Sequence, residues 1–279
     1  MAAAEALHPG AVDRPANALA ALEGGPAQTS GCQRCHDVGR PNADGSIGAC
    51  TACHARHAAS IELARTPETC GQCHMGPDHS QIEIYRESKH GVLFHTQRAS
   101  MNLGADPKRL TTRDMPVPTC ATCHMSGLEG AKVTHDTTER LSYWLFAEVS
   151  ERRPAATRGA QEMQDLCANC HARDSIERFY AQAADVVTRT NDLVRRGREV
   201  IEGLRAEHRL SPEPFDEPIE FAYFDLWHYY GRTAKHGAFM GGADFVQWHG
   251  FYELTHGLAE IEDEAARLRG VEAGATPAP

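Results

Sequence analysis

The C-terminal part of the chain alternates apolar and polar positions with a helical period. Residues 174–208 contain no proline and place apolar side chains three or four positions apart, with charged residues between them. These apolar positions are Ile176, Phe179, Ala183, Val186, Leu193, Val200 and Leu204. The pattern predicts one long amphipathic helix, and the prolines at 212, 214 and 218 are expected to end it.

Two further long helices are predicted after these prolines. One covers about residues 219–236, and the other runs from about 242 to 269. The last helix carries Phe245, Trp248, Tyr252, Leu258 and Ile261. Residues 176–270 therefore form a predicted C-terminal bundle of three long helices. Its apolar surface either folds back on the rest of the chain or meets a neighbouring subunit, and both arrangements remain open.

The remainder of the chain has a different character. Residues 31–175 show short helical pieces separated by turn residues. Residues 1–30 are rich in Ala, Gly and Pro and predict a flexible leader, and residues 271–279 predict a tail. We therefore expect a mainly α-helical protein with a domain of short helices at 31–175 and a region of long helices at 176–270.

Composition indicates that protein side chains alone supply little core. The chain has 279 residues, of which 41% are hydrophobic, and its mean hydropathy is −0.47. The net charge of −10 disfavours nucleic acid and anionic membrane surfaces as partners and suits a redox partner with a basic face. No apolar run is long enough to predict a membrane-spanning helix.

Every cysteine belongs to a C-x-x-C-H unit. The five units, which account for all ten cysteines, are CQRCH at Cys32, Cys35 and His36, CTACH at Cys50, Cys53 and His54, CGQCH at Cys70, Cys73 and His74, CATCH at Cys120, Cys123 and His124, and CANCH at Cys167, Cys170 and His171. In a c-type haem site, both thiols bind the porphyrin and the histidine is the proximal iron ligand. Zinc sites or disulfides would not explain a histidine after the second cysteine in all five units.

The sequence thus predicts five covalently bound haem c groups, each with its iron, and a core filled largely by them. The predicted proximal ligands are His36, His54, His74, His124 and His171. An electron-transfer haem needs a second axial imidazole, whereas a catalytic haem leaves that side open for substrate. One open haem would leave four distal ligands to find among the other eleven histidines.

Three of these distal ligands are predicted to be His57, His90 and His135. The fourth is expected from the C-terminal region, with His228 and His249 as the leading candidates. We expect His8, His95, His208 and His256 to be ordinary residues.

A possible proton donor lies between the third haem site and His90. Asp78 directly precedes His79, and an acid beside an imidazole suits a site that moves protons to or from a small substrate. The dipeptide is a weak signal by itself, because it occurs often by chance.

Several longer stretches carry a resemblance to a known family. ACTACHARHAASIELARTPETCGQCHMGPDHSQIEIYRESKHG, VPTCATCHMSG, RLSYWLFAEVSERRP and WHYYGRTAKHGAFMGGADFVQWHGFYEL closely resemble the hydroxylamine oxidoreductase family of multihaem cytochromes. The similarity covers roughly residues 30–260. Known members carry eight haems, the fourth being catalytic with a vacant distal side, and many are trimers.

The resemblance implies that this chain corresponds to the last five haems of those enzymes. The open catalytic haem would then be the first, held by Cys32, Cys35 and His36. The pentahaem ammonia-forming nitrite reductases share the five-haem core but are less similar, because their catalytic haem typically uses a lysine where this chain has His36.

The resemblance also assigns residues to the catalytic pocket. Asp78 and His79 in GPDHSQ match the family's distal Asp-His pair, and Tyr143 in RLSYW matches a tyrosine of the same pocket. Oxidising members bind a tyrosine of a neighbouring subunit covalently to the catalytic haem. This chain has Phe245 in that segment, although Tyr223, Tyr229 or Tyr230 could still serve.

These observations predict an oxidoreductase that acts on small nitrogen compounds. A haem without the cross-link favours reduction of nitrite or hydroxylamine, with the other four haems relaying electrons. Two alternatives remain: oxidation of hydroxylamine or hydrazine with a tyrosine-linked haem, and a non-catalytic electron carrier. The chain could also be the C-terminal fragment of an octahaem enzyme.

Location and partners follow from the same reasoning. Covalent haem attachment normally takes place outside the cytoplasm, so we expect a soluble periplasmic or otherwise extracytoplasmic protein. The first thirty residues do not resemble a signal peptide, because they include Asp13, Arg14 and early prolines, so the export signal is expected to have been removed or to lie upstream. The expected partners are a small nitrogenous substrate, a cytochrome or quinol-linked redox partner and, by resemblance, two further copies in a trimer.

Overall fold

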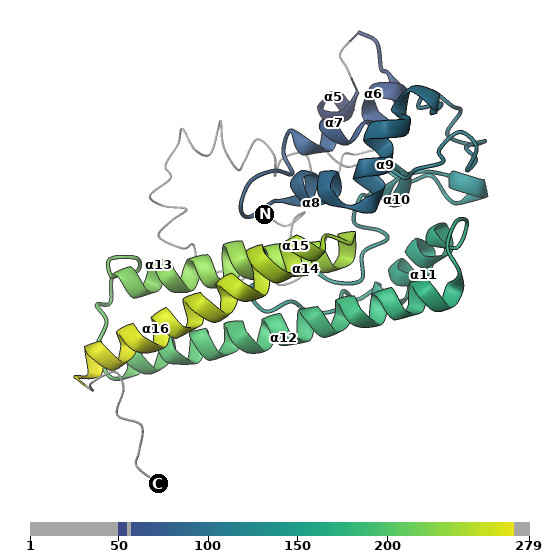
Figure 1. The fold of residues 1–279 in the computed structure, drawn as a ribbon. Helices are drawn as coiled ribbons and strands as arrows, with labels where there is room; N and C mark the ends of the chain where they lie inside the picture. Colours follow the sequence, from purple (N-terminus) through teal and green to yellow (C-terminus); the bar gives the residue numbers. More distant parts are fainter. Residues whose placement is uncertain (1–49, 55–56, 271–279) are drawn as a thin grey trace.

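The computed structural model describes residues 50–54 and 57–270, and these are almost entirely helices and loops (Figure 1). Within the described residues no β-strand is formed, and an isolated antiparallel bridge joins Tyr143 to Arg152. The prediction of a mainly α-helical fold is therefore confirmed. No helix among the described residues combines the length and apolar character needed to cross a membrane.

The first part of the described chain consists of short helices. These are α5 (Cys50–Cys53), α6 (Ile61–Arg65), α7 (Pro67–Gly71), α8 (Gln81–Glu87), α9 (Lys89–Gln97), η2 (Arg98–Ser100), α10 (Cys120–His124), η3 (Leu128–Gly130) and α11 (Ala156–Cys167). Local signals set several boundaries. Ser60 accepts a hydrogen bond from the amide of Leu63 and caps α6, and Pro67 occupies the first turn of α7. Ser88 caps α9 in the same way through the amide of Gly91.

A small hydrophobic cluster holds these short helices together. Its buried members are Ile82, Tyr85, Phe94, Leu103, Leu110, Met115, Val117, Leu128 and Leu166. Arg65 is buried beside them, and its Nη1 donates hydrogen bonds of 2.7 Å to the carbonyl of Leu103 and 2.6 Å to that of Ala105. The guanidinium group thereby fixes the loop that follows η2.

The predicted long helix is α12 (Arg173–Ala206), close to the expected range of 174–208. Its buried face differs slightly from the prediction, because Val187 and Val194 are buried while Val186 and Leu193 are half-buried at the flank. Ile176, Ala183 and Leu204 are buried as predicted. The helix continues the apolar stripe over its full length, which explains why it forms without interruption.

The other two predicted helices are present but are not uniform α-helices. The second comprises α13 (Pro218–Asp225), the π-helical turn η4 (Leu226–Gly231) and α14 (Arg232–Met240). The third comprises α15 (Ala243–Val246), a second π-helical turn η5 (Gln247–Tyr252) and α16 (Glu253–Arg269). Gly241, with a φ of 72°, makes the left-handed turn between the two runs.

These three helical runs pack along one another (Figure 1). α16 and α14 both contact α12, and α13 contacts α16. The shared core contains Val194, Ile201, Leu204, Leu210, Ile219, Phe224, Leu226, Trp227, Ala234, Leu254, Leu258, Ile261 and Ala265. Gly250 permits a close approach, since a Cβ at this position would lie 2.7 Å from the Cβ of Ala234.

The short-helix part contacts the C-terminal bundle through α8, which packs on α14. A second connection is made by the loop before α11, where Asn191 of α12 accepts a hydrogen bond from the amide of Ser150 and donates one to its carbonyl. The predicted division into domains at 31–175 and 176–270 stays a prediction. The predicted leader at 1–30 and tail at 271–279 lie outside the described residues.

Candidate functional site

Four of the five C-x-x-C-H units lie within the described residues, each at a helix or at its C-terminal end. The unit at Cys32, Cys35 and His36 lies outside them. Three of the four make the same local bond, because the amides of His54, His74 and His171 donate to the carbonyls of Cys50, Cys70 and Cys167 at 2.8, 2.9 and 2.9 Å. The fourth unit forms α10. A helical turn thus places both thiols and the imidazole of each unit within one compact segment.

The units are also neighbours in space. α7 contacts both α5 and α10, and α10 contacts α11. The thiols of Cys70 and Cys120, which belong to different units, form a hydrogen bond that raises the pKa of Cys120 well above its ordinary value, with burial adding to the effect. Burial also raises the pKa of Cys123 to about 12. Among the described cysteines none forms a disulfide.

The spacing and protonation of the histidines can be compared with what the two axial ligands of a haem need. The rings of His90 and His171 have centroids 5.9 Å apart and planes inclined at 54°. Two imidazoles that bind opposite sides of one metal, with nitrogens about 2 Å from it, have ring centres about 6 Å apart. Burial and the nearby His171 lower the pKa of His90, which favours the neutral form that a metal ligand needs. The separation of His90 and His171 is close to this value, but so is the 6.2 Å between His74 and His79, so His90 stays a predicted distal ligand.

Two of the predicted proximal ligands are also suited to binding iron. Nδ1 of His54 is buried and has no hydrogen-bond partner in the described structure. Burial lowers the pKa of His124 to about 4, so its imidazole is neutral at physiological pH. Paired thiols beside neutral imidazoles are the donor set that covalent haem attachment requires.

The other predicted distal ligands occupy varied positions. His57 is exposed in a turn, with a φ of 69°, and His135 is exposed in the loop before α11. His249 lies on η5 with 59% of its side chain exposed, and its Nε2 is 3.2 Å from Asp244. His228 is half-buried on η4 and stacks on Phe224. Their roles stay predictions.

A buried histidine that the sequence reasoning did not single out is His236 on α14. Its side chain is 5% exposed, its Nδ1 has no hydrogen-bond partner, and its Nε2 is 3.4 Å from Nε2 of Gln81. Burial lowers its pKa well below the ordinary value, and the nearby charges of Lys235 and Arg232 add to the effect. One signal could have indicated it, because His228, Arg232 and His236 are spaced four residues apart along one helical run.

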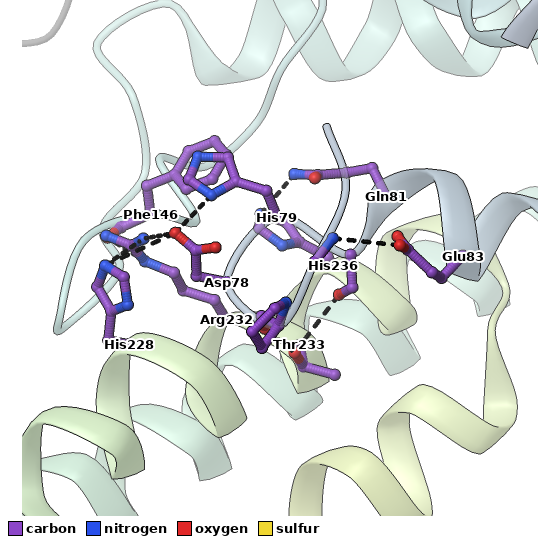
Figure 2. Close-up of polar contacts among 12 residues, drawn as sticks. Asp78, His79, Gln81, Glu83, Phe146, His228, Arg232, Thr233 and His236 are labelled. Atoms are coloured by element: carbon purple, nitrogen blue, oxygen red, sulfur yellow. Dashed lines mark hydrogen bonds and ion pairs between the residues drawn. The ribbon is translucent and has the colours of Figure 1, made fainter. Parts of the chain in front are cut away.

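The predicted Asp-His pair forms a direct contact in the loop between α7 and α8 (Figure 2). Nδ1 of His79 lies 2.6 Å from Oδ2 of Asp78, with 22% and 27% of the two side chains exposed. The ring of His79 is 6.2 Å from that of His74, the predicted proximal ligand of the third haem. The pair is therefore partly open to solvent and close to one haem attachment unit.

Two residues of the C-terminal bundle complete the surroundings of Asp78. Nη1 of Arg232 is 3.6 Å and Nε2 of His228 is 3.9 Å from Oδ2 of Asp78. Burial opposes ionisation of Asp78, but the hydrogen bond and charge of His79, together with His228 and Arg232, outweigh it and hold the pKa of Asp78 below its usual value. The carboxylate is therefore ionised over most of the pH range.

Tyr143, which the resemblance assigns to the catalytic pocket, lies in the loop before α11, and its role stays a prediction. Its ring packs 5.7 Å from that of Phe239, and the guanidinium of Arg152 lies 5.7 Å above it. It lines a cavity of about 200 Å³ together with Tyr180. The aromatic ring next to His79 is Phe146, at 4.9 Å, three residues further along the same sequence motif. Phe146 is thus a neighbour of His79 that the sequence analysis did not single out.

Phe245, which the resemblance aligns with the tyrosine of oxidising members, is buried at 8% exposure, and its ring centroid is 5.0 Å from that of His249. Of the alternative tyrosines, Tyr223 donates a hydrogen bond to Glu148. Tyr229 and Tyr230 pack half-buried against the core of the C-terminal bundle.

Comparison with known proteins agrees with the arrangement of the attachment units. A family model described as seven times multi-haem cytochrome CxxCH matches residues 10–213. A probable nitrite reductase-hydroxylamine oxidoreductase fusion protein of Kuenenia stuttgartiensis is 21% identical over 328 aligned residues, which cover 88% of this chain and 37% of that protein.

Two solved structures share the fold. A hypothetical multihaem protein matches with a TM-score of 0.75 and 25% identity over 84% of this chain and 60% of its own. The reducing HAO-like protein complex of Kuenenia stuttgartiensis matches with a TM-score of 0.75 and 22% identity over 92% of this chain and 64% of that one. The chain thus spans less than two thirds of each of these relatives.

Proposed function

This chain belongs to the multihaem CxxCH cytochrome family and is related to HAO-like proteins; from that premise we propose that it reduces nitrite or hydroxylamine towards ammonia. In this proposal it binds five haem c groups. Cys32, Cys35 and His36 hold the haem whose distal side is open, and the other four relay electrons.

The observation that carries the proposal is the contact between Asp78 and His79. The ionised carboxylate of Asp78 orients the imidazole of His79 through Nδ1, and both side chains are partly accessible. Breaking an N–O bond by reduction consumes protons as well as electrons, so a reductase of this kind needs a proton donor at the reacting atom. The curated relative's name supports nitrogen-oxide chemistry in such a protein.

The residues of this chain supply the proton and the surroundings of the reaction. When bound, the haems provide electrons and an iron that can bind the substrate nitrogen. His79 donates a proton to the substrate oxygen, and Asp78 orients the imidazole through Nδ1. Phe146, whose ring centroid is 4.9 Å from that of His79, limits the access of water to that side of the imidazole. Tyr143 remains a predicted hydrogen-bond donor to the bound N–O group.

The relay haems need four distal histidines. We assign His90 to the haem held by His171, because their rings are 5.9 Å apart. His57 and His135 remain the next two. His236 is the fourth, since it is buried with one ring nitrogen unpartnered, while His228 and His249 are the alternatives.

Reduction is favoured over oxidation by Phe245. It has no phenol oxygen and is buried in its own chain, so it cannot form the covalent link to haem of the oxidising relatives. Optical and EPR spectra of the oxidised and reduced protein, with and without hydroxylamine, test this point. A ligand-responsive high-spin signal without a red-shifted ferrous band supports the reductase. A red-shifted band would indicate a cross-linked, oxidising haem, and unresponsive low-spin spectra would indicate an electron carrier.

The direct test of the mechanism is His79→Ala. Nitrite and hydroxylamine turnover with a chemical reductant should fall by about 10²- to 10⁴-fold, the usual contribution of a general acid, while the low-spin spectra stay the same. His95→Ala is the matched control, because His95 lies exposed on α9 and has no assigned role. Equal turnover in the two variants would remove His79 from the mechanism.

Assembly and location are further parts of the proposal. Trp248 and Tyr252, 59% and 53% exposed on η5, form an aromatic surface that supports a homo-oligomer, with a trimer favoured. Sedimentation as a monomer would contradict it. The haem attachment units support an extracytoplasmic location, and the net charge of −10 supports a redox partner with a basic face.

A further inference from the structure

Arg232 connects the Asp78–His79 pair to the C-terminal bundle, and the proposed mechanism does not use it. It is the first residue of α14 and is 4% exposed. Its Nη1 lies 3.6 Å from Oδ2 of Asp78, a residue more than 150 positions earlier in the sequence. We propose that Arg232 is a positioning residue for proton donation by His79, an inference that rests on the proposed function of His79.

The guanidinium group is fixed in one orientation by its other contacts (Figure 2). Its Nε donates a hydrogen bond of 3.1 Å to the carbonyl of Phe146, and its Nη1 lies 2.8 Å from Nε2 of His228, which accepts a hydrogen bond from it. The rings of Phe146 and Trp227 lie 5.3 and 5.2 Å from its central carbon. A planar group held by several bonds and aromatic rings cannot turn away from Asp78 without breaking them.

This fixed charge determines where the Asp78 carboxylate lies. Asp78 is followed by His79 in a loop, so its own backbone allows several side-chain orientations. Arg232 holds Oδ2 on the side where it also contacts Nδ1 of His79 at 2.6 Å. Removing the guanidinium would leave a partly buried carboxylate without its fixed cation, and the carboxylate would turn towards water. His79 would then lose the contact that keeps Nε2 directed at the substrate.

A direct role in binding an anionic substrate such as nitrite is the competing explanation for a cation here. Arg232 is nearly inaccessible, at 4% exposure, and its contacts include Asp78, His228 and the Phe146 carbonyl. The two roles differ in kinetics. A positioning residue affects kcat for nitrite and hydroxylamine alike, whereas an anion-binding residue affects KM for nitrite and leaves neutral hydroxylamine unchanged.

The experiment compares Arg232→Gln, Asp78→Asn and the double variant as full-length, haem-loaded proteins. Arg232→Gln should lower kcat by about 10- to 100-fold for both substrates with little change in KM. Adding Arg232→Gln to Asp78→Asn should cause almost no further loss, because the arginine acts through the carboxylate. A crystal structure of Arg232→Gln should show Asp78 separated from His79 with the haem ligands in place.

Arg232→Lys provides a second test of the positioning role if the glutamine variant folds poorly. Lysine keeps the charge but cannot reach Phe146, His228 and Asp78 together, so its kcat should lie between those of Arg232→Gln and wild type. Arg196→Gln is the matched control, since it removes another arginine–carboxylate pair, with Glu262 at 2.7 Å on the exposed surface, and should leave kcat unchanged.

The outcomes separate the two proposals. Independent, multiplicative losses in the double variant, a KM effect confined to nitrite, or wild-type kcat in Arg232→Lys would each overturn the positioning role. A silent His79→Ala would overturn the proposed function itself. A large loss in His79→Ala with wild-type kcat in Arg232→Gln would overturn the role of Arg232 alone.

Discussion

The Asp78 carboxylate has a protonation equilibrium that the fold perturbs in a defined direction. Burial disfavours its charge, yet His79, His228 and Arg232 together lower its pKa. A lowered pKa in the folded state means that ionised Asp78 stabilises the fold above the unfolded pKa of about 3.9. That stabilisation is lost as the pH falls through the lower, folded pKa.

We therefore predict that Asp78→Asn is less stable than wild type at neutral pH and that the difference shrinks as the pH falls below about 4. Thermal melting of the two proteins between pH 7 and pH 3 measures it. A difference that stays constant over this range would mean that the Asp78 charge does not stabilise the fold.

The predicted role of His90 as a distal haem ligand can also be tested with a single substitution. If it is the distal ligand opposite His171, His90→Ala exposes that iron to water and converts one low-spin haem to high-spin. EPR of the oxidised protein should show the new signal, in proportion to one haem. His256→Ala, which alters an exposed histidine of α16, is the control and should leave the spectrum unchanged. An unaltered spectrum in His90→Ala would assign the position to another residue.

The sequence identified single residues only where they stand in local motifs. The cysteines, their adjacent histidines and the Asp78–His79 pair are all visible in the sequence, and Asp78 does contact His79. Arg232 and His236 were not found, because they approach this loop from a helix far along the chain. Phe146 was missed for a similar reason, since a motif indicates which segment enters a pocket but not which of its side chains points there.

At the scale of helices, hydrophobic periodicity predicted the three long runs but not their π-helical turns. Each of η4 and η5 inserts extra residues into a turn, which shifts the face that the following helix buries. No residue pattern indicates such an insertion in advance. Both turns lie in runs that pack on α12 through α14 and α16.

Gly250 provides the test for this packing. A methyl group at this position would lie 2.7 Å from both the Cβ of Ala234 and the carbonyl oxygen of Phe245. We predict that Gly250→Ala lowers the thermal midpoint by about 2–10 °C, as overpacking of a core does. Gly104→Ala, where nothing lies within 4 Å of the added atom, is the control. Equal midpoints would show that η5 and α14 can move apart at little cost.

At the scale of the whole molecule, the composition predicted that apolar side chains would supply little core. The described residues form two separate hydrophobic clusters. The smaller cluster is buried among the short helices, and the larger one fills the C-terminal bundle. The attachment units at α5, α7, α10 and α11 are linked by helix contacts. Periodicity could not indicate this, because the units recur at irregular intervals in the sequence and come together only through tertiary contacts.

The proposed open haem is tested by the double variant Cys32→Ser and Cys35→Ser. We predict that the protein loses one haem of five by pyridine haemochrome analysis and loses the hydroxylamine-responsive signal. The low-spin signals of the relay haems should persist. A retained response to hydroxylamine would place the open iron at another attachment unit.

The contact between α7 and α10 has a consequence for maturation of the protein. These two helices carry Cys70 and Cys120, which belong to different attachment units, and each unit needs both of its sulfurs for its own haem. A disulfide between two units would block attachment at both of them. Attachment of the haems before the two helices come together would avoid that competition.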